Sequence, residues 1–405
     1  MTSGVNPFRH FLLAGMVMVV LMFVLKFLAA SLIEGEQLKP VLDWFGHEHQ
    51  QSAGIQSETQ SIPGHTNPVT PRSSVRYQWQ ALPDKPPSPM HNPWNKARAE
   101  VGKRLFSDTN LSLDRSVSCA SCHDNDTHAG ADGRPTAVGV GGQAGPRNSP
   151  TVWNSAYQQW LFWDGRAASL EEQAIGPLLN PIEMAMPSAE AVVARVREDR
   201  VYIELFEQAF GSADAIGINA IVAALAAYQR TLITPDSPYD RYVRGDTSAL
   251  NPVQLRGMAL FEELGCVNCH SGPNFSGAGI LANNSPWRIF PALDTPFEQQ
   301  YQLTEDLGMA PAGSTKGVWR IPSLRNVAQT APYFHNGSVT ELEEAVRIMA
   351  SAQLGHQLAQ TASKSEFVWS DDGYLIPVQR RTVTEQEVQA IVAFLESLSG
   401  ELSHY

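Results

Sequence analysis

The chain has 405 residues, of which 43% are hydrophobic and 17% charged, so it can bury substantial cores, and its length predicts two domains. Its formal net charge of −12 argues against binding to nucleic acid or to an anionic membrane surface, because either would require an extended basic patch. A basic partner protein is compatible with this charge.

Residues 11–33 form an almost uninterrupted apolar stretch in which Lys26 is the only charged side chain. A run of this length can span a bilayer, and the positive residue Arg9 before it predicts that the bulk of the chain lies outside the cytoplasm. We interpret residues 1–33 as an uncleaved membrane anchor. A signal peptide is the alternative, although Leu28-Ala29-Ala30-Ser31 is a mediocre cleavage site.

Residues 34–90 are rich in Gln, Ser, Pro and His and show no sustained helical or strand period, which predicts a flexible linker. Beyond the linker, helical periodicity recurs while convincing alternating strands are few, so the predicted fold class is mainly α. Long Gly- and Pro-rich stretches at 129–150 and 274–322 predict irregular loops with a function. The expected helices cover 97–106, 189–210, 218–232, 254–261, 341–349 and 385–398.

All four cysteines lie in two copies of one pattern, in which two thiols three positions apart are followed at once by a histidine. Two thiols at this spacing can each bond one vinyl group of a single porphyrin, while the adjacent imidazole reaches the iron. A redox-active dithiol or half of a zinc site would leave the histidine after each pair unexplained. The pattern therefore predicts two covalently attached c-type haems. Its copies are Cys119-Ala-Ser-Cys122-His123 and Cys266-Val-Asn-Cys269-His270.

Each attachment motif follows a similar helical approach, 97–106 before the first and 254–261 before the second. This repetition predicts two cytochrome c-like haem domains. We expect the first at residues 91–240 and the second at residues 241–405. Because covalent haem attachment in bacteria occurs outside the cytoplasm, the expected location is the periplasmic side of the inner membrane, or the soluble periplasm if residues 1–33 are cleaved.

Five further motifs occur in order between the first haem site and the C-terminal region. They are Arg147-Asn-Ser-Pro-Thr151, Phe162-Trp-Asp-Gly-Arg-Ala167, Glu172-Gln-Ala174 with Glu183-Met184, Pro322-Ser-Leu-Arg-Asn-Val327 and Ala331-Pro-Tyr-Phe-His-Asn-Gly337. Together they resemble the bacterial di-haem cytochrome c peroxidases and their methylamine-utilisation relatives. The resemblance runs from about residue 92 to residue 400 and implies reduction of hydrogen peroxide to water.

The resemblance implies a division of labour between the two haems. Peroxide would react at the haem of His123, and electrons would enter at the haem of His270. Met349 matches the axial methionine of the second haem in these peroxidases, and a His/Met pair raises the haem potential, as an electron-accepting site requires. Without the motif, a lone Met on an apolar helix face indicates core packing.

Three residues match the family's catalytic positions. Glu183 would move a proton between the peroxide oxygens, and Gln173 would hold the peroxide by a hydrogen bond. Trp163 matches the tryptophan between the haems and would carry electrons between them. Outside these motifs, the same residues would be interpreted as a first-turn Glu, a surface Gln and a core Trp.

The resemblance also implies a calcium site between the domains. Its ligands would be Asn148 and the backbone carbonyls of Thr330 and Pro332, and amide and carbonyl oxygens are suitable hard ligands for Ca²⁺. Three protein ligands leave such a site dependent on water.

One position departs from the family pattern. Many of these peroxidases carry a histidine before Arg-Asn-Ser-Pro-Thr that blocks the peroxidatic iron until the other haem is reduced. Val140 stands at that position, and valine cannot bind iron. We therefore expect an open iron in the fully oxidised protein and no need for reductive activation, unless His128 or another residue substitutes.

Two other functions remain open. MauG-type relatives also lack the blocking histidine and oxidise residues of a partner protein, but they carry a tyrosine where this chain has Met349. A non-catalytic di-haem electron carrier would explain the haems but not Gln173 and Glu183. The expected partners are hydrogen peroxide and an electron donor, which would be a cytochrome c, a cupredoxin or a membrane quinol pathway, and a homodimer is compatible.

Overall fold

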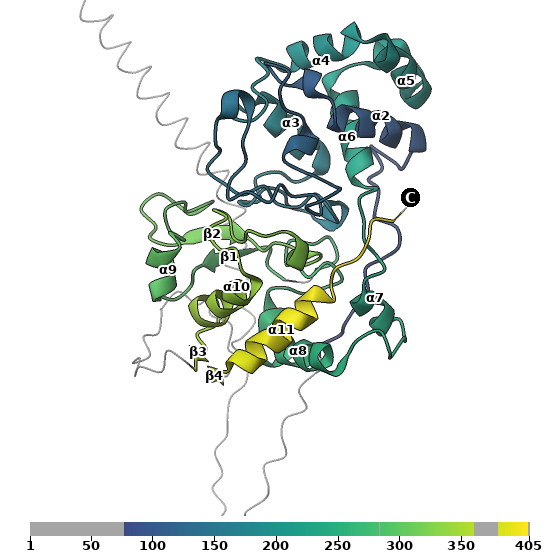
Figure 1. Cartoon of the computed structure of the whole chain (residues 1–405). Coiled ribbons are helices and arrows are strands. Elements are labelled where there is room, and N and C mark those ends of the chain that lie inside the picture. The colour runs from purple at the N-terminus through teal and green to yellow at the C-terminus, as the bar shows by residue number, and fades with distance from the viewer. Residues whose placement is uncertain (1–76, 283, 360–379, 404–405) are drawn as a thin grey trace, which may run out of the picture. The chain divides into compact units, whose positions relative to one another are not determined.

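The computed structural model describes residues 77–282, 284–359 and 380–403. They belong to one compact unit, whose helices and strands are labelled in Figure 1. The apolar stretch at 11–33 and most of the expected linker lie outside the described residues. None of the described helices has the length and apolar character that a membrane crossing requires.

The first haem region is a cluster of helices (Figure 1). Side-chain caps start several of them, and Ser169 accepts a hydrogen bond from the Glu172 backbone at the start of α3. The single helix expected at 189–210 is two helices, because Asp199 ends α4 and caps α5 by accepting from the Val201 backbone. The helices are α2 (Lys96–Phe106), α3 (Leu170–Leu179), α4 (Ala189–Glu198), α5 (Arg200–Phe210) and α6 (Ile218–Gln229).

The second haem region contains the remaining helices and two small sheets (Figure 1). The expected loop at 274–322 holds an antiparallel strand pair, in which Trp287 is opposite Arg320. A parallel pair joins residues on either side of the gap at 360–379. The elements are α7 (Pro238–Val243), α8 (Pro252–Glu263), β1 (Trp287–Phe290), α9 (Pro296–Gln300), β2 (Gly317–Arg320), α10 (Leu342–Ile348), β3 (Gln357–Leu358), β4 (Thr382–Val383) and α11 (Glu385–Glu396).

The same close helix crossing occurs in both haem regions. In the first region, a Cβ added to Gly102 on α2 would lie 1.9 Å from the carbonyl oxygen of Ala224 on α6. In the second region, a Cβ added to Gly257 on α8 would lie 1.8 Å from the carbonyl oxygen of Ala390 on α11. No side chain fits at such distances, so glycine allows each helix pair to touch backbone to backbone. The helix before each haem motif is thus packed in the same way, which supports the duplication expected from sequence.

Residues 77–84, which fall within the expected linker, are held by the second haem region. The Tyr77 backbone donates to Glu262 at 3.0 Å, and its hydroxyl accepts from the Gly272 backbone at 2.7 Å. Trp79 packs edge-on against Phe394, with ring centroids 5.7 Å apart. These contacts bring the start of the described chain close to the second haem motif.

A buried ion pair fixes the segment that follows the second haem histidine. The Arg325 guanidinium meets both carboxylate oxygens of Asp240 at 2.7 and 2.9 Å, and both side chains are fully buried. Arg325 also donates to the Pro273 carbonyl at 2.8 Å, and Asp240 accepts from the Leu82 backbone at 2.8 Å. One charge pair therefore connects α7, the loop after His270 and residues 77–84.

We expect Arg325→Leu to lower the free energy of unfolding by about 3–5 kcal/mol, because it leaves the Asp240 carboxylate buried without its cation. Arg241→Leu is the matched control, since Arg241 pairs with Asp236 at the surface and such pairs contribute about 1 kcal/mol or less. Denaturant unfolding measures both. Equal losses of unfolding free energy in the two variants would show that the buried pair contributes no more to stability than the exposed pair.

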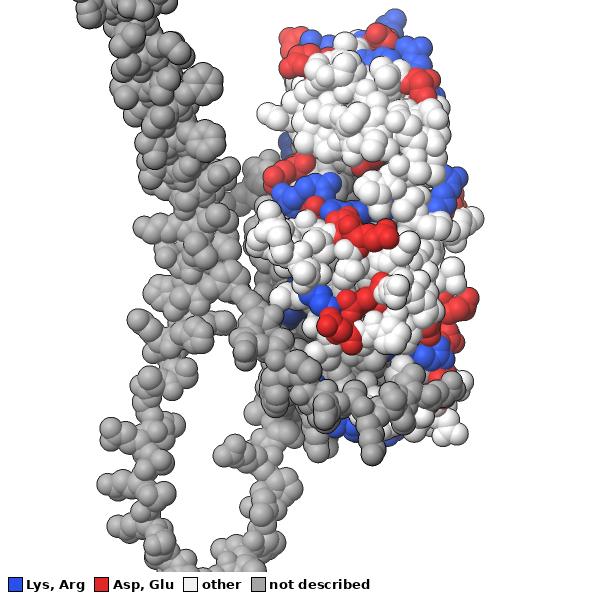
Figure 2. Space-filling model, turned by 90° about the vertical axis from the view of Figure 1, so that its left-hand side faces the viewer, with Lys and Arg blue, Asp and Glu red and all other residues white. Residues whose placement is uncertain are grey.

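One face of the molecule carries charged side chains of both signs. On the face in Figure 2, basic and acidic groups form mixed clusters separated by uncharged surface. This face offers no continuous basic area for nucleic acid.

Candidate active site: a cavity between two haem-attachment motifs

Both attachment motifs begin with a short 3-10 turn, Cys119–Ser121 in one region and Cys266–Asn268 in the other. In each turn the backbone N–H of the histidine donates to the carbonyl oxygen of the first cysteine. The distance is 2.9 Å from His123 to Cys119 and 2.9 Å from His270 to Cys266. None of the four cysteines forms a disulfide. The four thiols are therefore available to bond haem, as the sequence predicts.

The two histidines are oriented in the same way. Nδ1 of His123 lies 3.1 Å from the Gly130 carbonyl oxygen, and Nδ1 of His270 lies 3.2 Å from that of Phe275. A carbonyl can only accept, so each Nδ1 carries the proton and each Nε2 keeps a lone pair for a metal. Burial lowers the pKa of both imidazoles, that of His270 to about 4, which keeps them neutral.

One continuous cavity of about 490 Å³ joins the two motifs. His123 lies on its wall in the first region and His270 in the second. It also brings together the other site residues predicted from sequence, except Cys119, which does not line it. These are Cys122, Asn148, Trp163, Gln173, Glu183, Cys266, Cys269, Thr330, Pro332 and Met349.

The cavity wall contains polar groups that fit a carboxylate-bearing porphyrin. Nε of Arg288, Nε1 of Trp319 and Nε2 of His335 are buried and have no hydrogen-bond partner among the described residues, and all three residues line the cavity. Arg320 also lines it, and burial lowers the pKa of its guanidinium to about 10, against the effect of Asp164. Haem propionates would supply acceptors for the three unpaired groups and a negative charge beside Arg320, whose guanidinium already donates to the Phe162 carbonyl and to Gln158. The residues present therefore fit two c-type haems.

Glu183 is the buried carboxylate on the first haem's side. Burial raises its pKa, while the Arg166 cation and a hydrogen bond from Asn180 act in the opposite direction. The Asn180 amide donates to its Oε1 at 2.7 Å and so fixes its orientation. Gln173, on α3, lies on the same cavity. Because its pKa is raised, a carboxyl held in this way takes up a proton at higher pH than an exposed glutamate does, and it can return that proton to a bound partner.

Val140 is buried but does not line the cavity. Its backbone donates to the Glu183 carbonyl at 2.9 Å, and a Cβ on Gly139 would lie 2.0 Å from the Ile182 carbonyl oxygen. The loop is thus pinned to the backbone of Glu183. His128 is also absent from the lining, and its Nδ1 lies 2.7 Å from the Thr127 hydroxyl on a partly exposed surface.

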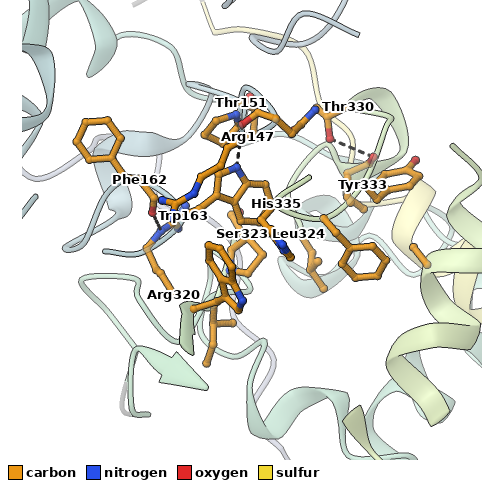
Figure 3. Close-up of a pocket in the computed structure, with 18 of the residues that line it drawn as sticks. Arg147, Thr151, Phe162, Trp163, Arg320, Ser323, Leu324, Thr330, Tyr333 and His335 are labelled. Carbon is orange, nitrogen blue, oxygen red and sulfur yellow. Dashed lines mark hydrogen bonds between the residues drawn. The ribbon is translucent and has the colours of Figure 1, made fainter. Parts of the chain in front are cut away.

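Trp163 is held by segments from both haem regions (Figure 3). Its indole nitrogen donates to the Asn148 carbonyl at 2.9 Å, and its own carbonyl accepts from the Arg320 backbone at 2.9 Å. The Asn148 backbone in turn donates to the His335 carbonyl at 2.7 Å. Trp163 therefore lies at the junction of the two regions.

A charged and aromatic cluster beside Trp163 was not predicted. Arg147 bonds Asp164 at 2.7 Å and Asp306 at 2.6 Å, and its guanidinium lies 5.0 Å from the centre of the Trp319 ring. The His335 ring stacks on Trp319 at 4.0 Å, and burial lowers the pKa of His335 to about 4. Arg147 and His335 stand in the motifs recognised from sequence, so their positions were marked, but nothing in the sequence assigned them a role.

Met349 directly follows α10 and starts a π-helical turn, Met349–Gln353. It lines the cavity on the second region's side, beside Leu342 and Val346 of the same helix and Ile391 of α11. Irregular turns of this type recur at functional sites.

The predicted calcium ligands meet at the same cavity. Asn148, Thr330 and Pro332 all line it, and the Asn148 amide nitrogen donates to the Arg134 carbonyl at 2.8 Å, which leaves its oxygen for another partner. Within the described residues no group of three or more His, Cys, Asp or Glu is placed to hold a metal ion. The calcium site stays a prediction, because its ligands would be amide and carbonyl oxygens.

Comparisons with known proteins agree with this geometry. Residues 96–248 match the family model of di-haem cytochrome c peroxidase, and residues 254–399 match that of cytochrome c. Cytochrome c551 peroxidase of Pseudomonas aeruginosa is 38% identical over 80% of this chain and 84% of its own length. Methylamine utilization protein MauG of Methylorubrum extorquens is 36% identical over 79% of this chain and 83% of its own.

A solved structure shares the fold. The crystal structure of a MauG-like protein associated with microbial copper homeostasis superposes with a TM-score of 0.64 at 31% identity, over 80% of this chain and 96% of that one. The two matched cytochrome regions, each with its Cys-x-x-Cys-His motif, imply c-type haems. The chain is a peroxidase oxidoreductase and belongs to the di-haem cytochrome c peroxidase family.

Proposed function

We propose that the chain reduces hydrogen peroxide at the haem held by Cys119, Cys122 and His123, with electrons that enter at the haem held by Cys266, Cys269 and His270. The observation that carries the proposal is one cavity whose lining includes Glu183 of the first haem region, Met349 of the second, and Trp163. The conversion of one hydrogen peroxide to two waters takes two electrons and two protons. The haems would supply the electron-transfer chemistry. A passive carrier would need no buried proton-transfer group.

The protein residues handle the protons and the positioning. Glu183 accepts a proton from the peroxide oxygen nearer the first haem and returns it to the other oxygen, while the Gln173 amide hydrogen-bonds the peroxide. Asn180 keeps the carboxylate aimed at this position. Met349 would help to hold the second haem through its thioether, and a His/Met pair there would raise the haem potential and favour electron entry.

The electron donor would be a cytochrome c, a cupredoxin or a membrane quinol pathway. The family implies peroxide and a cytochrome donor, and the acidic chain suits a basic partner. The apolar stretch at 11–33 supports a location on the periplasmic side of the inner membrane. Calcium at Asn148 and assembly as a homodimer belong to the same proposal.

Peroxide-dependent oxidation of a reduced small cytochrome c by the holoenzyme tests the proposal. We expect two cytochromes oxidised for each peroxide consumed. Peroxide consumption without cytochrome oxidation would argue against it and favour the MauG-like alternative.

We further propose that the first haem's iron has an open position in the oxidised protein, since Val140 cannot bind iron and its loop is pinned to Glu183. Electron paramagnetic resonance of the fully oxidised protein should then show one high-spin haem. Two low-spin haems would mean that another residue occupies the position.

A MauG-like oxidation of a partner protein is the second candidate, favoured by Val140 and by the 36% identity to a MauG. Peroxide treatment with periplasmic extract, followed by mass spectrometry, would detect new oxidised residues on a partner. Met349 in place of a tyrosine weighs against this function.

The pH profile should reveal the Glu183 carboxyl. Its pKa lies above the usual 4.5, so turnover that needs the carboxylate falls as the pH drops through this raised value. Arg166→Gln removes the cation that lowers this pKa, so the acid limb should move to higher pH, whereas Arg166→Lys should leave it nearly in place. A limb that stays fixed in both variants would assign it to another group.

Trp163→Phe should slow electron transfer between the haems at least several-fold and leave both haem spectra unchanged, because phenylalanine is much harder to oxidise. Flash reduction of the second haem, followed by absorbance, measures the rate. An unchanged rate would remove Trp163 from the electron path.

A further inference from the structure

His356 lies seven residues after Met349 and is 3% exposed. Its Nε2 lies 3.0 Å from the Leu264 carbonyl oxygen, and its Nδ1 lies 3.3 Å from the backbone nitrogen of Arg381. A backbone N–H can only donate, so Nδ1 is the acceptor and Nε2 carries the proton given to Leu264. The ring is therefore neutral and fully engaged.

These bonds connect three segments that are far apart in sequence. Leu264 directly follows α8 and stands two residues before Cys266 of the second haem motif. Arg381 directly precedes β4. The backbone of His356 itself donates to the Ala350 carbonyl at 2.8 Å, within the π-helical turn that starts at Met349. His356 thus joins the π-helical turn Met349–Gln353, called the methionine turn below, to the residue that follows α8 and precedes the second haem motif.

The methionine turn needs such an anchor, because it departs from the regular helix. Leu354 bonds back five residues to the Met349 carbonyl at 3.1 Å, and the chain then reverses at Gly355, whose φ is +72°. A Cβ on Gly355 would lie 2.7 Å from the Arg380 guanidinium. The direction in which Met349 points therefore depends on where the residues after it are fixed.

We propose that His356 is a positioning residue for the second haem, which holds the Met349 thioether at bonding distance from the iron by clamping the methionine turn to the Leu264 carbonyl. The inference rests on the proposed function, in which Met349 is the axial ligand. A partner beyond the direct ligand commonly sets a ligand's orientation, and its loss commonly weakens metal binding about 10–100-fold.

Neutral imidazole suits this position for two reasons. Burial, the largest cause, and the nearby Arg381 and Arg380 cations lower the pKa of His356. A second ring proton would also point at the Arg381 N–H. Glutamine could reproduce the donation to Leu264, whereas leucine fills similar space and donates nothing.

The test uses the holoenzyme and the sulfur-to-iron charge-transfer band of the oxidised second haem, together with the reduction potential of that haem. We expect His356→Leu to lose most of the band and to lower the potential, and His356→Gln to retain both. Gln357→Ala is the matched control, because this exposed neighbour on β3 pairs with the described part of the chain through its backbone. A folded His356→Leu with the full band and unchanged potential would overturn the proposal.

A second pair of variants decides the matter if His356→Leu does not fold. His356→Asn is too short to reach the Leu264 carbonyl and should lose the band, whereas His356→Gln should keep it, and equal bands in both would overturn the clamp. Failure of the proposed function is distinguishable, because the band would then be absent from the wild type or unaffected by Met349→Leu.

Discussion

Replacing Glu183 by glutamine is expected to lower peroxide turnover by about a hundredfold or more, the usual contribution of a positioned general acid–base group. The substitution keeps the size of the side chain and the contact with Asn180, but the amide cannot take up the proton that burial and the raised pKa allow the carboxyl to exchange. Steady-state peroxide reduction with a reduced cytochrome measures the loss.

Both haem spectra should be unchanged in Glu183→Gln, since the residue holds neither haem. Glu172→Gln is a suitable control, because this exposed carboxylate of α3 bonds the Ala168 backbone and does not line the cavity. Turnover that survives in Glu183→Gln would remove this carboxyl from the mechanism.

Replacing Met349 by leucine should lower the reduction potential of the second haem by at least about 59 mV, the one-electron equivalent of a tenfold change in the reduction equilibrium. Leucine preserves the apolar contacts with α10 and α11 but removes the thioether that favours the reduced iron. Spectroelectrochemical titration separates the two haems by their absorbance.

The rate of electron entry should fall with the reduction potential of the second haem. Met349→Leu should therefore oxidise the donor cytochrome more slowly, while the first haem still reacts with peroxide. Met258→Leu is the matched control, because this buried methionine of α8 is absent from the cavity lining. A potential that does not change in Met349→Leu would mean that another residue binds the second iron.

The attachment motifs and most helices could be predicted because their signals are local. Cys119-Ala-Ser-Cys122-His123 and its copy carry their chemistry in five consecutive residues, and the helices before them show their periodicity within a few turns. The predicted helix at 189–210 was too long, because the periodicity continues through Asp199, while its side chain stops one helix and caps the next.

The rest depends on contacts between distant residues. The Arg320 side chain donates to the Phe162 carbonyl across 158 positions, and His356 reaches Leu264 across 92. No local pattern marks such pairs. Residues 77–84 have the composition of a linker, yet Trp79 packs into an aromatic cluster formed by the second haem region. The motif resemblance named Gln173, Glu183 and Met349, which all line one cavity in the structure, but it named none of the groups that hold them.

A single-turnover experiment tests the two-haem mechanism most directly. Protein with only the second haem reduced would be mixed rapidly with one equivalent of hydrogen peroxide, and the absorbance of that haem followed. We predict that the second haem is reoxidised as the peroxide is consumed, at a rate that Trp163→Phe lowers. A second haem that stays reduced while the peroxide disappears would contradict the proposed path from the second haem to the first.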